Sequence, residues 1–143
     1  MTKVLLSLHV IAAIIAVGPV TVAASMFPAA ARRDQTTHLA VLHRICRVYA
    51  VVGIAVPLFG LATASSLGVL GDVWLLISIG LTAAAAAVLV FLVLPGQERL
   101  LPGAADGTVA TRTRLGMHTG IFNLLWATVT VLMIVRPGST TGA

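Results

Sequence analysis

The stretch VLLSLHVIAAIIAVGPVTVAASMFPAAA, from Val4 to Ala31, decides the fold class because its 28 residues include no Asp, Glu, Lys or Arg. About 20 apolar residues are enough for a helix to cross a hydrocarbon core roughly 30 Å thick. Lipid offers no water to the backbone N–H and C=O groups, so a crossing segment satisfies them within a helix. The stretch is too long for the apolar part of a signal peptide, and we expect it to be a retained membrane-spanning helix.

Three more charge-free stretches follow along the 143-residue chain: 24 residues from Val48 to Gly71, 25 from Val73 to Gln97 and 21 from Leu115 to Val135. None of them alternates polar and apolar residues as the strands of a membrane barrel do. The sequence therefore predicts an all-α polytopic membrane protein. We expect one domain, a bundle of four transmembrane helices over about 4–27, 37–66, 73–94 and 113–135.

The overall composition points the same way. Hydrophobic residues make up 59% of the chain, charged residues make up 9%, and the mean hydropathy is +1.07. Soluble domains are about 45–50% apolar and about 25% charged. The net charge of +5 needs no nucleic acid to explain it, because no recognition motif is present and arginines pair with anionic lipid headgroups. The expected surroundings are a lipid bilayer with anionic headgroups.

Local signals predict where the helices begin, end and bend. Pro28 is expected to end the first helix at Phe27, since the residue before a proline is disfavoured in the α region. The third helix is expected to stop before Pro95. Pro19 and Pro57 each remove a hydrogen bond inside a helix and predict kinks in helices 1 and 2. The expected N-caps are Thr36 or Thr37 for the second helix, Asp72 for the third and Thr111 or Thr113 for the fourth.

The positive charges predict the orientation. Seven of the nine Lys and Arg residues belong to the connection between helices 1 and 2 with the start of helix 2, or to the connection between helices 3 and 4. Lys3 and Arg136 are the other two. Because Lys and Arg accumulate on cytoplasmic loops, both connections are expected in the cytoplasm and both termini outside the plasma membrane of a bacterium. The Ala/Gly-rich composition, with eight Arg and one Lys, looks actinobacterial.

Small residues mark the faces where helices are expected to meet, because close approach drives helix association in lipid. On helix 2, Gly53, Pro57 and Gly60 belong to a stripe of small residues. On helix 4, Gly116 and Gly120 form a GxxxG pattern that Asn123 continues. The pattern fits packing within the chain and self-association equally well.

Three histidines are the main candidates for a cofactor site. His43 and His118 lie at the same end of two parallel helices, as the ligands of a bis-histidine b-haem would. Three arginines at that level are suited to haem propionates or to lipid headgroups: Arg44, Arg47 and Arg114. His9, near the external end of helix 1, is a third candidate haem ligand. The competing interpretation is that no cofactor is bound and that the histidines make structural hydrogen bonds.

Catalytic patterns are missing from the sequence. It has no P-loop, no HExxH motif and no nucleophile elbow, and it does not gather the three or four ligands of a zinc site. The acidic residues all fall in predicted loops, which argues against an ion-coupled transporter. We expect no enzyme activity.

The first helix carries a resemblance. Leu8-His9-Val10-Ile11-Ala12-Ala13-Ile14-Ile15-Ala16-Val17-Gly18 resembles the opening L-H-x-x-A-A-x-x-x-x-G of an uncharacterised bacterial family of predicted four-helix integral membrane proteins, a domain of unknown function. It is also distantly similar to the first helix of copper-resistance D-type membrane proteins, some of which are suspected haem binders. The resemblance implies a four-helix membrane fold and no established activity.

Three functions follow as hypotheses. The first is a non-catalytic accessory subunit of a larger membrane complex, such as a respiratory one, bound to other membrane subunits or to a second copy. The second is a b-haem electron-transfer or quinone-linked redox subunit that uses the histidines. The third is a small-solute or metal-handling membrane protein.

Overall fold

The computed structural model describes residues 1–105 and 107–139, and within these ranges it contains helices and no strand. The all-α prediction is therefore confirmed. The elements are α1 (Thr2–Arg32), α2 (Thr36–Val52), α3 (Ala55–Leu67), α4 (Val73–Val88), the π-helical turn η1 (Leu89–Val93), α5 (Leu94–Glu98) and α6 (Val109–Val135). In the described part of the chain, four helical segments are long and apolar enough to cross a membrane: 2–32, 36–67, 73–98 and 109–135.

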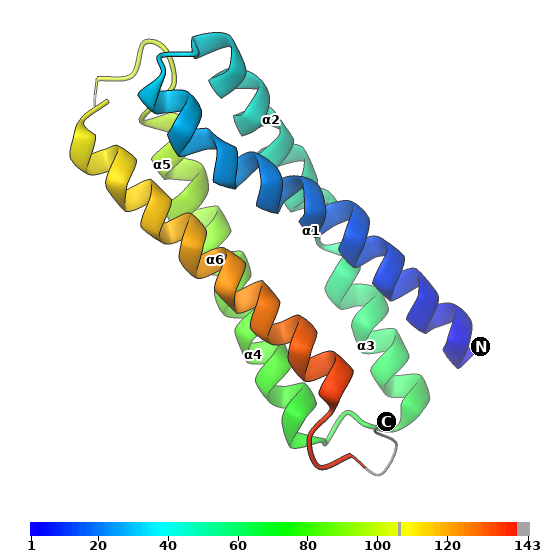
Figure 1. Ribbon diagram of the computed structural model, residues 1–143. Helices are drawn as coiled ribbons and strands as arrows, with labels where there is room; N and C mark the ends of the chain where they lie inside the picture. Colours follow the sequence, from blue (N-terminus) through cyan, green and yellow to red (C-terminus); the bar gives the residue numbers. More distant parts are fainter. Residues whose placement is uncertain (106, 140–143) are drawn as a thin grey trace.

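The four segments lie side by side as an elongated bundle (Figure 1). Helix α1 packs against α2, α3 and α6, while α4 packs against α6 and α2 reaches α5. The α1–α2 connection and the start of α6 lie at one end, which we call the arginine-loop end, and Arg112 Nη2 lies 3.9 Å from Asp34 Oδ1 there. The start of α1 meets the end of α3 at the opposite end, where Thr2 Oγ1 and Ser66 Oγ are 2.7 Å apart.

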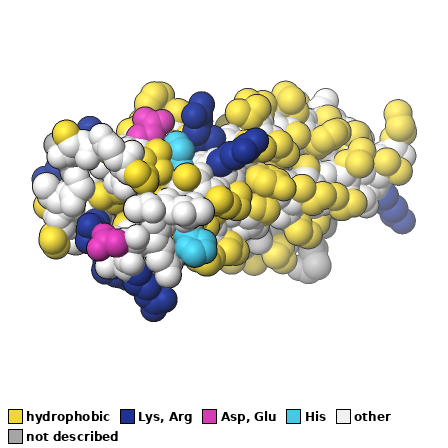
Figure 2. All heavy atoms as spheres, turned by 90° about the horizontal axis from the view of Figure 1, so that it is seen from above, with side chains coloured by type: hydrophobic (Ala, Val, Ile, Leu, Met, Phe, Trp, Pro, Cys, Tyr) yellow, Lys and Arg dark blue, Asp and Glu magenta, His cyan; other side chains and the backbone are white. Residues whose placement is uncertain are grey.

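The buried core occupies mainly the half of the bundle towards the arginine-loop end. Phe27, Leu115 and Phe122 are its largest apolar side chains, and each is at most 2% exposed. A smaller cluster surrounds Trp74 near the α3–α4 connection. Much of the remaining surface is hydrophobic, whereas most of the charged side chains visible from above gather over one part of the molecule (Figure 2). Apolar area on this scale is unusual for soluble monomers and needs lipid or protein to cover it.

The second segment is broken at Gly53 and Ile54, where one continuous helix over 37–66 was expected. Pro57 explains the break, because it has no N–H to give to the carbonyl four residues earlier. That carbonyl, Gly53 O, instead accepts from Val56 N at 3.1 Å, a tighter bond that ends the regular α-helical ladder. Helix α3 begins immediately afterwards.

The third segment does not stop before Pro95 as expected but continues through α5 to Glu98. The turn before the proline widens into η1, where Leu94 N donates to Leu89 O, five residues back. Proline occupies the first turn of α5, a position that tolerates its missing donor. The extra helical residues include Gln97, which is fully buried.

Three other expected boundaries shift. Helix α1 passes through Pro28 to Arg32, and its extra turn is held by the burial of Ala30 and Ala31. Helix α6 starts earlier than expected and is capped by Thr108, whose Oγ1 accepts from Thr111 N at 3.2 Å. The N-cap of α2 is Gln35, whereas Asp72 is the N-cap of α4 as expected. The Asp72 carboxylate accepts from the Trp74 indole at 3.0 Å rather than from the backbone.

Candidate functional site

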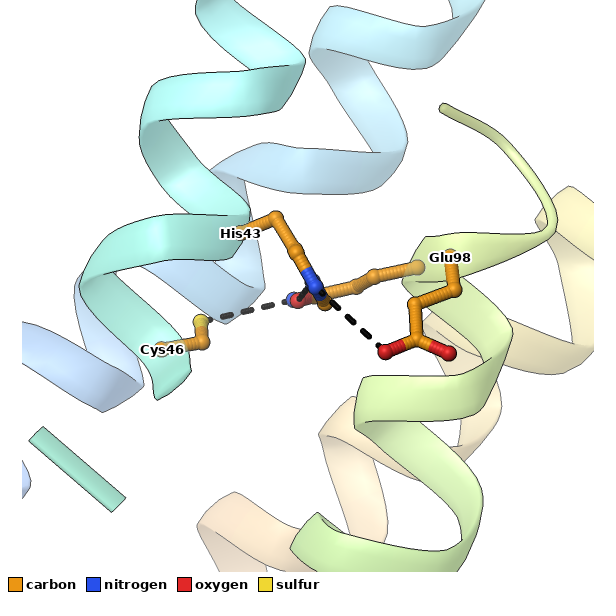
Figure 3. A network of polar contacts seen from close by, with 4 residues as sticks. His43, Cys46 and Glu98 are labelled. Atoms are coloured by element: carbon orange, nitrogen blue, oxygen red, sulfur yellow. Dashed lines mark hydrogen bonds and ion pairs between the residues drawn. The ribbon is translucent and has the colours of Figure 1, made fainter. Parts of the chain in front are cut away.

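A buried polar network joins α2 to α5 near the arginine-loop end (Figure 3). His43 Nδ1 lies 2.9 Å from Gln97 Oε1, and Gln97 Nε2 donates to Cys46 Sγ at 3.4 Å. Gln97 and Cys46 have no exposed surface, and His43 is 6% exposed. Because an amide oxygen only accepts, this network assigns the donated proton to His43 Nδ1.

The second nitrogen of the imidazole connects the network to the surface. His43 Nε2 lies 3.7 Å from Glu98 Oε1, and the Glu98 side chain is 58% exposed. The two nitrogens of one buried ring therefore face an amide on one side and a carboxylate in contact with solvent on the other (Figure 3). The separation from Glu98 is longer than a hydrogen bond, and the Cys46 thiol contacts the Gln97 amide rather than the imidazole.

Local structure explains how these side chains come together. His43 and Cys46 are three residues apart on α2 and therefore share a helix face. On α5, the neighbour of Gln97 is Gly96, where an added Cβ would lie 3.2 Å from Leu115 Cδ1. This glycine lets α5 pack closely against α6. The close packing, together with the continuation of the helix beyond Pro95, brings Gln97 into the interior against α2.

His9 lies in a separate structural site between α1 and α3. Its Nδ1 is 2.9 Å from Val56 O, so it donates to a carbonyl in the first turn of α3. A Cβ added at Gly60 would lie only 2.9 Å from His9 Cε1, which shows that this glycine makes room for the ring. Gly60 is thus a close-approach residue.

His118 and His43 do not share a site in the structure. Both nitrogens of His43 face Gln97 and Glu98, and His118 makes no hydrogen bond or ion pair within the ranges described. The neighbours of His118 that point into the bundle are Leu115 and Thr119. The three histidines that the sequence singled out therefore occupy three different environments.

The three candidate arginines are exposed. Arg44 and Arg47 line a shallow groove of about 310 Å³ along α2, together with His43. Among the residues that the structure describes, Arg44, Arg47 and Arg114 have no carboxylate within 4.0 Å. They remain available to an external anion.

The glycine pair of α6 does not pack within the chain. A Cβ added at Gly116 or Gly120 would meet no heavy atom within 4 Å. Asn123, by contrast, joins α6 to α1, since its Nδ2 donates to Ser25 Oγ at 3.0 Å. The pair therefore does not serve packing within the chain, and self-association, the other interpretation of the GxxxG pattern, stays a prediction.

Gln97 and Glu98 are the site residues that the sequence analysis missed. Gln97 ends the third charge-free stretch, but it follows Pro95-Gly96, a pair that was expected to end the helix. Within residues 1–105 and 107–139, no group of three His, Cys, Asp or Glu residues could hold a metal ion. No protein-family model, curated protein or solved structure matches the chain.

Proposed function

We propose that the chain is an integral membrane protein of a bacterial plasma membrane, with its arginine-loop end in the cytoplasm. Four helical segments of sufficient length and apolar character support insertion. The clustering of Arg-bearing connections at one end supports the orientation. The proposal also includes a kink in the first helical segment at Pro19 and one in the second at Pro57.

Within that membrane, the proposed role is a non-catalytic accessory subunit of a larger membrane complex, such as a respiratory one. The observation that carries it is the open space above Gly116 and Gly120 on α6. Two glycines four residues apart let a second helix approach closely. In the buried network, Gln97 hydrogen-bonds to both His43 and Cys46, which favours a structural role for these side chains over a catalytic one.

Extraction in a mild detergent and native electrophoresis test this role. The wild-type chain is expected to migrate with a partner complex, and Gly116→Leu with Gly120→Leu is expected to release it. Gly80→Leu is the matched control, because Gly80 on α4 also has nothing within 4 Å of an added Cβ. A wild-type chain that migrates as a lone monomer in every extract would contradict the proposal.

A b-haem or quinone-linked redox subunit is the second candidate. The observation in its favour is that the Nδ1–H of His43 is held by Gln97, much as an outer hydrogen bond orients a metal-bound histidine. Glu98 would have to turn away from Nε2 to open a ligand position there. The third hypothesis, a small-solute or metal-handling membrane protein, has only the resemblance of the first helix behind it.

A reduced-minus-oxidised spectrum of the pure chain, expressed with haem supplied, separates the two candidates. The accessory role predicts no b-haem absorption band. A band that is lost in His43→Gln and retained in His9→Gln would replace the accessory role with the redox role.

A further inference from the structure

A cleft of about 440 Å³ lies among all four helical segments. This volume is within the range of ligand pockets, about 300–1,000 Å³. Aliphatic and aromatic side chains form most of its lining. The lining includes Arg47, Gly53, Thr82, Ala86, Leu89 and Trp126.

Two backbone irregularities border the cleft. Gly53 and Ile54, at the break between α2 and α3, line one side, and Leu89 and Val90 of η1 line another. Across the described residues, α3 makes no extended contact with α4, so the bundle is not closed along this seam. Ile54 is 59% exposed and Val90 is 47% exposed, which places an apolar rim at the surface.

The polar groups at the cleft differ in what they offer an occupant. Trp126 lines the cleft, but its indole Nε1 has less than 1 Å² of accessible surface and is not open to it. Arg47 also lines it, is exposed, and has no carboxylate within 4.0 Å among the residues described. Thr82 is already satisfied, because its hydroxyl donates to Ser78 O at 2.7 Å. An occupant therefore needs an apolar body and a negative charge.

We propose that the cleft binds one anionic phospholipid, an inference that rests on the proposed membrane location. An acyl chain fills the apolar lining and lies against Trp126, and the phosphate pairs with Arg47 and its neighbour Arg44. Arg44 and Arg47 share the groove on α2, which allows both to reach one phosphate. A neutral quinone would fit the apolar lining but would leave the arginines unexplained.

Tryptophan fluorescence in vesicles provides the test. Trp74 and Trp126 are the two tryptophans, so Trp74→Phe leaves the indole at the cleft as the only one. This variant is reconstituted in phosphatidylcholine with increasing fractions of brominated phosphatidylglycerol or brominated phosphatidylcholine. Half-maximal quenching is expected at about a fivefold lower fraction of the anionic lipid.

Two pairs of substitutions, each added to Trp74→Phe, test whether the quenching preference arises at the cleft. Arg47→Gln is expected to remove the preference for the anionic lipid, whereas Arg33→Gln, an exposed arginine at the same end that does not line the cleft, is expected to keep it. Ala86→Phe, which fills the cleft, is expected to weaken quenching by the anionic lipid, and Ala87→Phe, its neighbour outside the lining, is not.

The outcomes separate the two proposals. Equal quenching by both lipids, or an equal effect of Arg33→Gln and Arg47→Gln, would overturn the lipid site and leave the membrane location standing. No quenching by either lipid would also overturn the lipid site, because no acyl chain would then reach Trp126. Stronger quenching by a short-chain quinone than by the anionic lipid would assign the cleft to a neutral occupant and end this proposal.

Discussion

Gln97 is the single side chain that connects α2 to α5 in two directions. Its oxygen accepts from His43 and its nitrogen donates to Cys46, and the residue has no exposed surface. A buried donor that loses its acceptor retains the full cost of its desolvation. The stability of the arginine-loop end therefore depends on this amide more than on the exposed charges around it.

Gln97→Leu is expected to lower the free energy of unfolding by about 1–3 kcal/mol, because it leaves His43 Nδ1–H without an acceptor. Thermal unfolding in detergent, followed by circular dichroism, measures the change. The double variant His43→Leu with Gln97→Leu should be less damaging than the sum of the single variants, since both polar partners are removed together. Glu98→Gln, at an exposed position, should shift stability by less than about 1 kcal/mol. If Gln97→Leu matched Glu98→Gln, the amide would not hold the two helices together.

Gly60 has an equally specific role, which is to leave room for the His9 ring. Gly60→Ala should destabilise the chain by about 1–3 kcal/mol, because the new methyl would sit 2.9 Å from Cε1. In the same unfolding assay, Gly80→Ala should be neutral or stabilising, since its added Cβ meets nothing and alanine favours helix. Adding His9→Ala to Gly60→Ala should recover part of the loss. A Gly60→Ala chain as stable as the Gly80→Ala chain would show that the ring moves aside freely.

At the scale of the elements, the four helical segments were predictable because length and the absence of charge suffice to identify them. The interruptions were not, because each depends on where a lost hydrogen bond is replaced. Pro57 indicates from the sequence that one backbone hydrogen bond is missing. The break itself lies at Gly53–Ile54, where Gly53 O accepts from Val56 N instead. Pro95 was expected to end a helix, yet η1 absorbs it and the helix continues. Kinks at Pro19 and Pro57 stay predictions.

The same limit applies to the site. His43 was identifiable because an ionisable residue in an apolar segment is a functional candidate. Its partner Gln97 lies 54 residues away and becomes buried only because α5 continues beyond the expected end. His118, chosen by the same reasoning, has no partner within the ranges described. Depth along a helix can be read from the sequence, whereas the direction of the side chain depends on the packing.

The start of α6 provides a prediction at this scale. Thr108→Ala should destabilise the helix by about 1 kcal/mol, because the Thr108 hydroxyl accepts from Thr111 N. Thr113→Ala removes an exposed hydroxyl that bonds only to Val109 O one turn back, and it should change stability by less than about 0.5 kcal/mol. Thermal unfolding compares the two directly. A larger loss in Thr113→Ala than in Thr108→Ala would return the helix start to the position first expected.

For the whole molecule, the distribution of apolar and charged groups determines the surroundings that it needs. Ile14, Phe91 and Leu124 are 68%, 73% and 70% exposed, and they lie on three different helical segments. Exposed apolar residues on several sides of a bundle fit lipid better than a single protein partner, which would cover one face. The proposed bilayer thus covers most of the apolar surface. The open glycines of α6 and the cleft are the two places where we propose a partner helix and a single bound lipid.

The two ends of the bundle yield the last prediction, which concerns membrane sidedness. Single cysteines at Gln35 and Gly107, both exposed near the arginine-loop end, should react with a membrane-impermeant maleimide only in inverted vesicles. Pro137→Cys, exposed just beyond the end of α6, should react only in intact cells. The native chain is its own control, because Cys46 has no exposed surface and should stay unlabelled in both preparations. If Gln35→Cys and Gly107→Cys reacted from opposite sides, the four segments would not all cross the bilayer. If both reacted in intact cells, the bundle would cross in the reverse orientation, and Arg44 and Arg47 would face the outer leaflet.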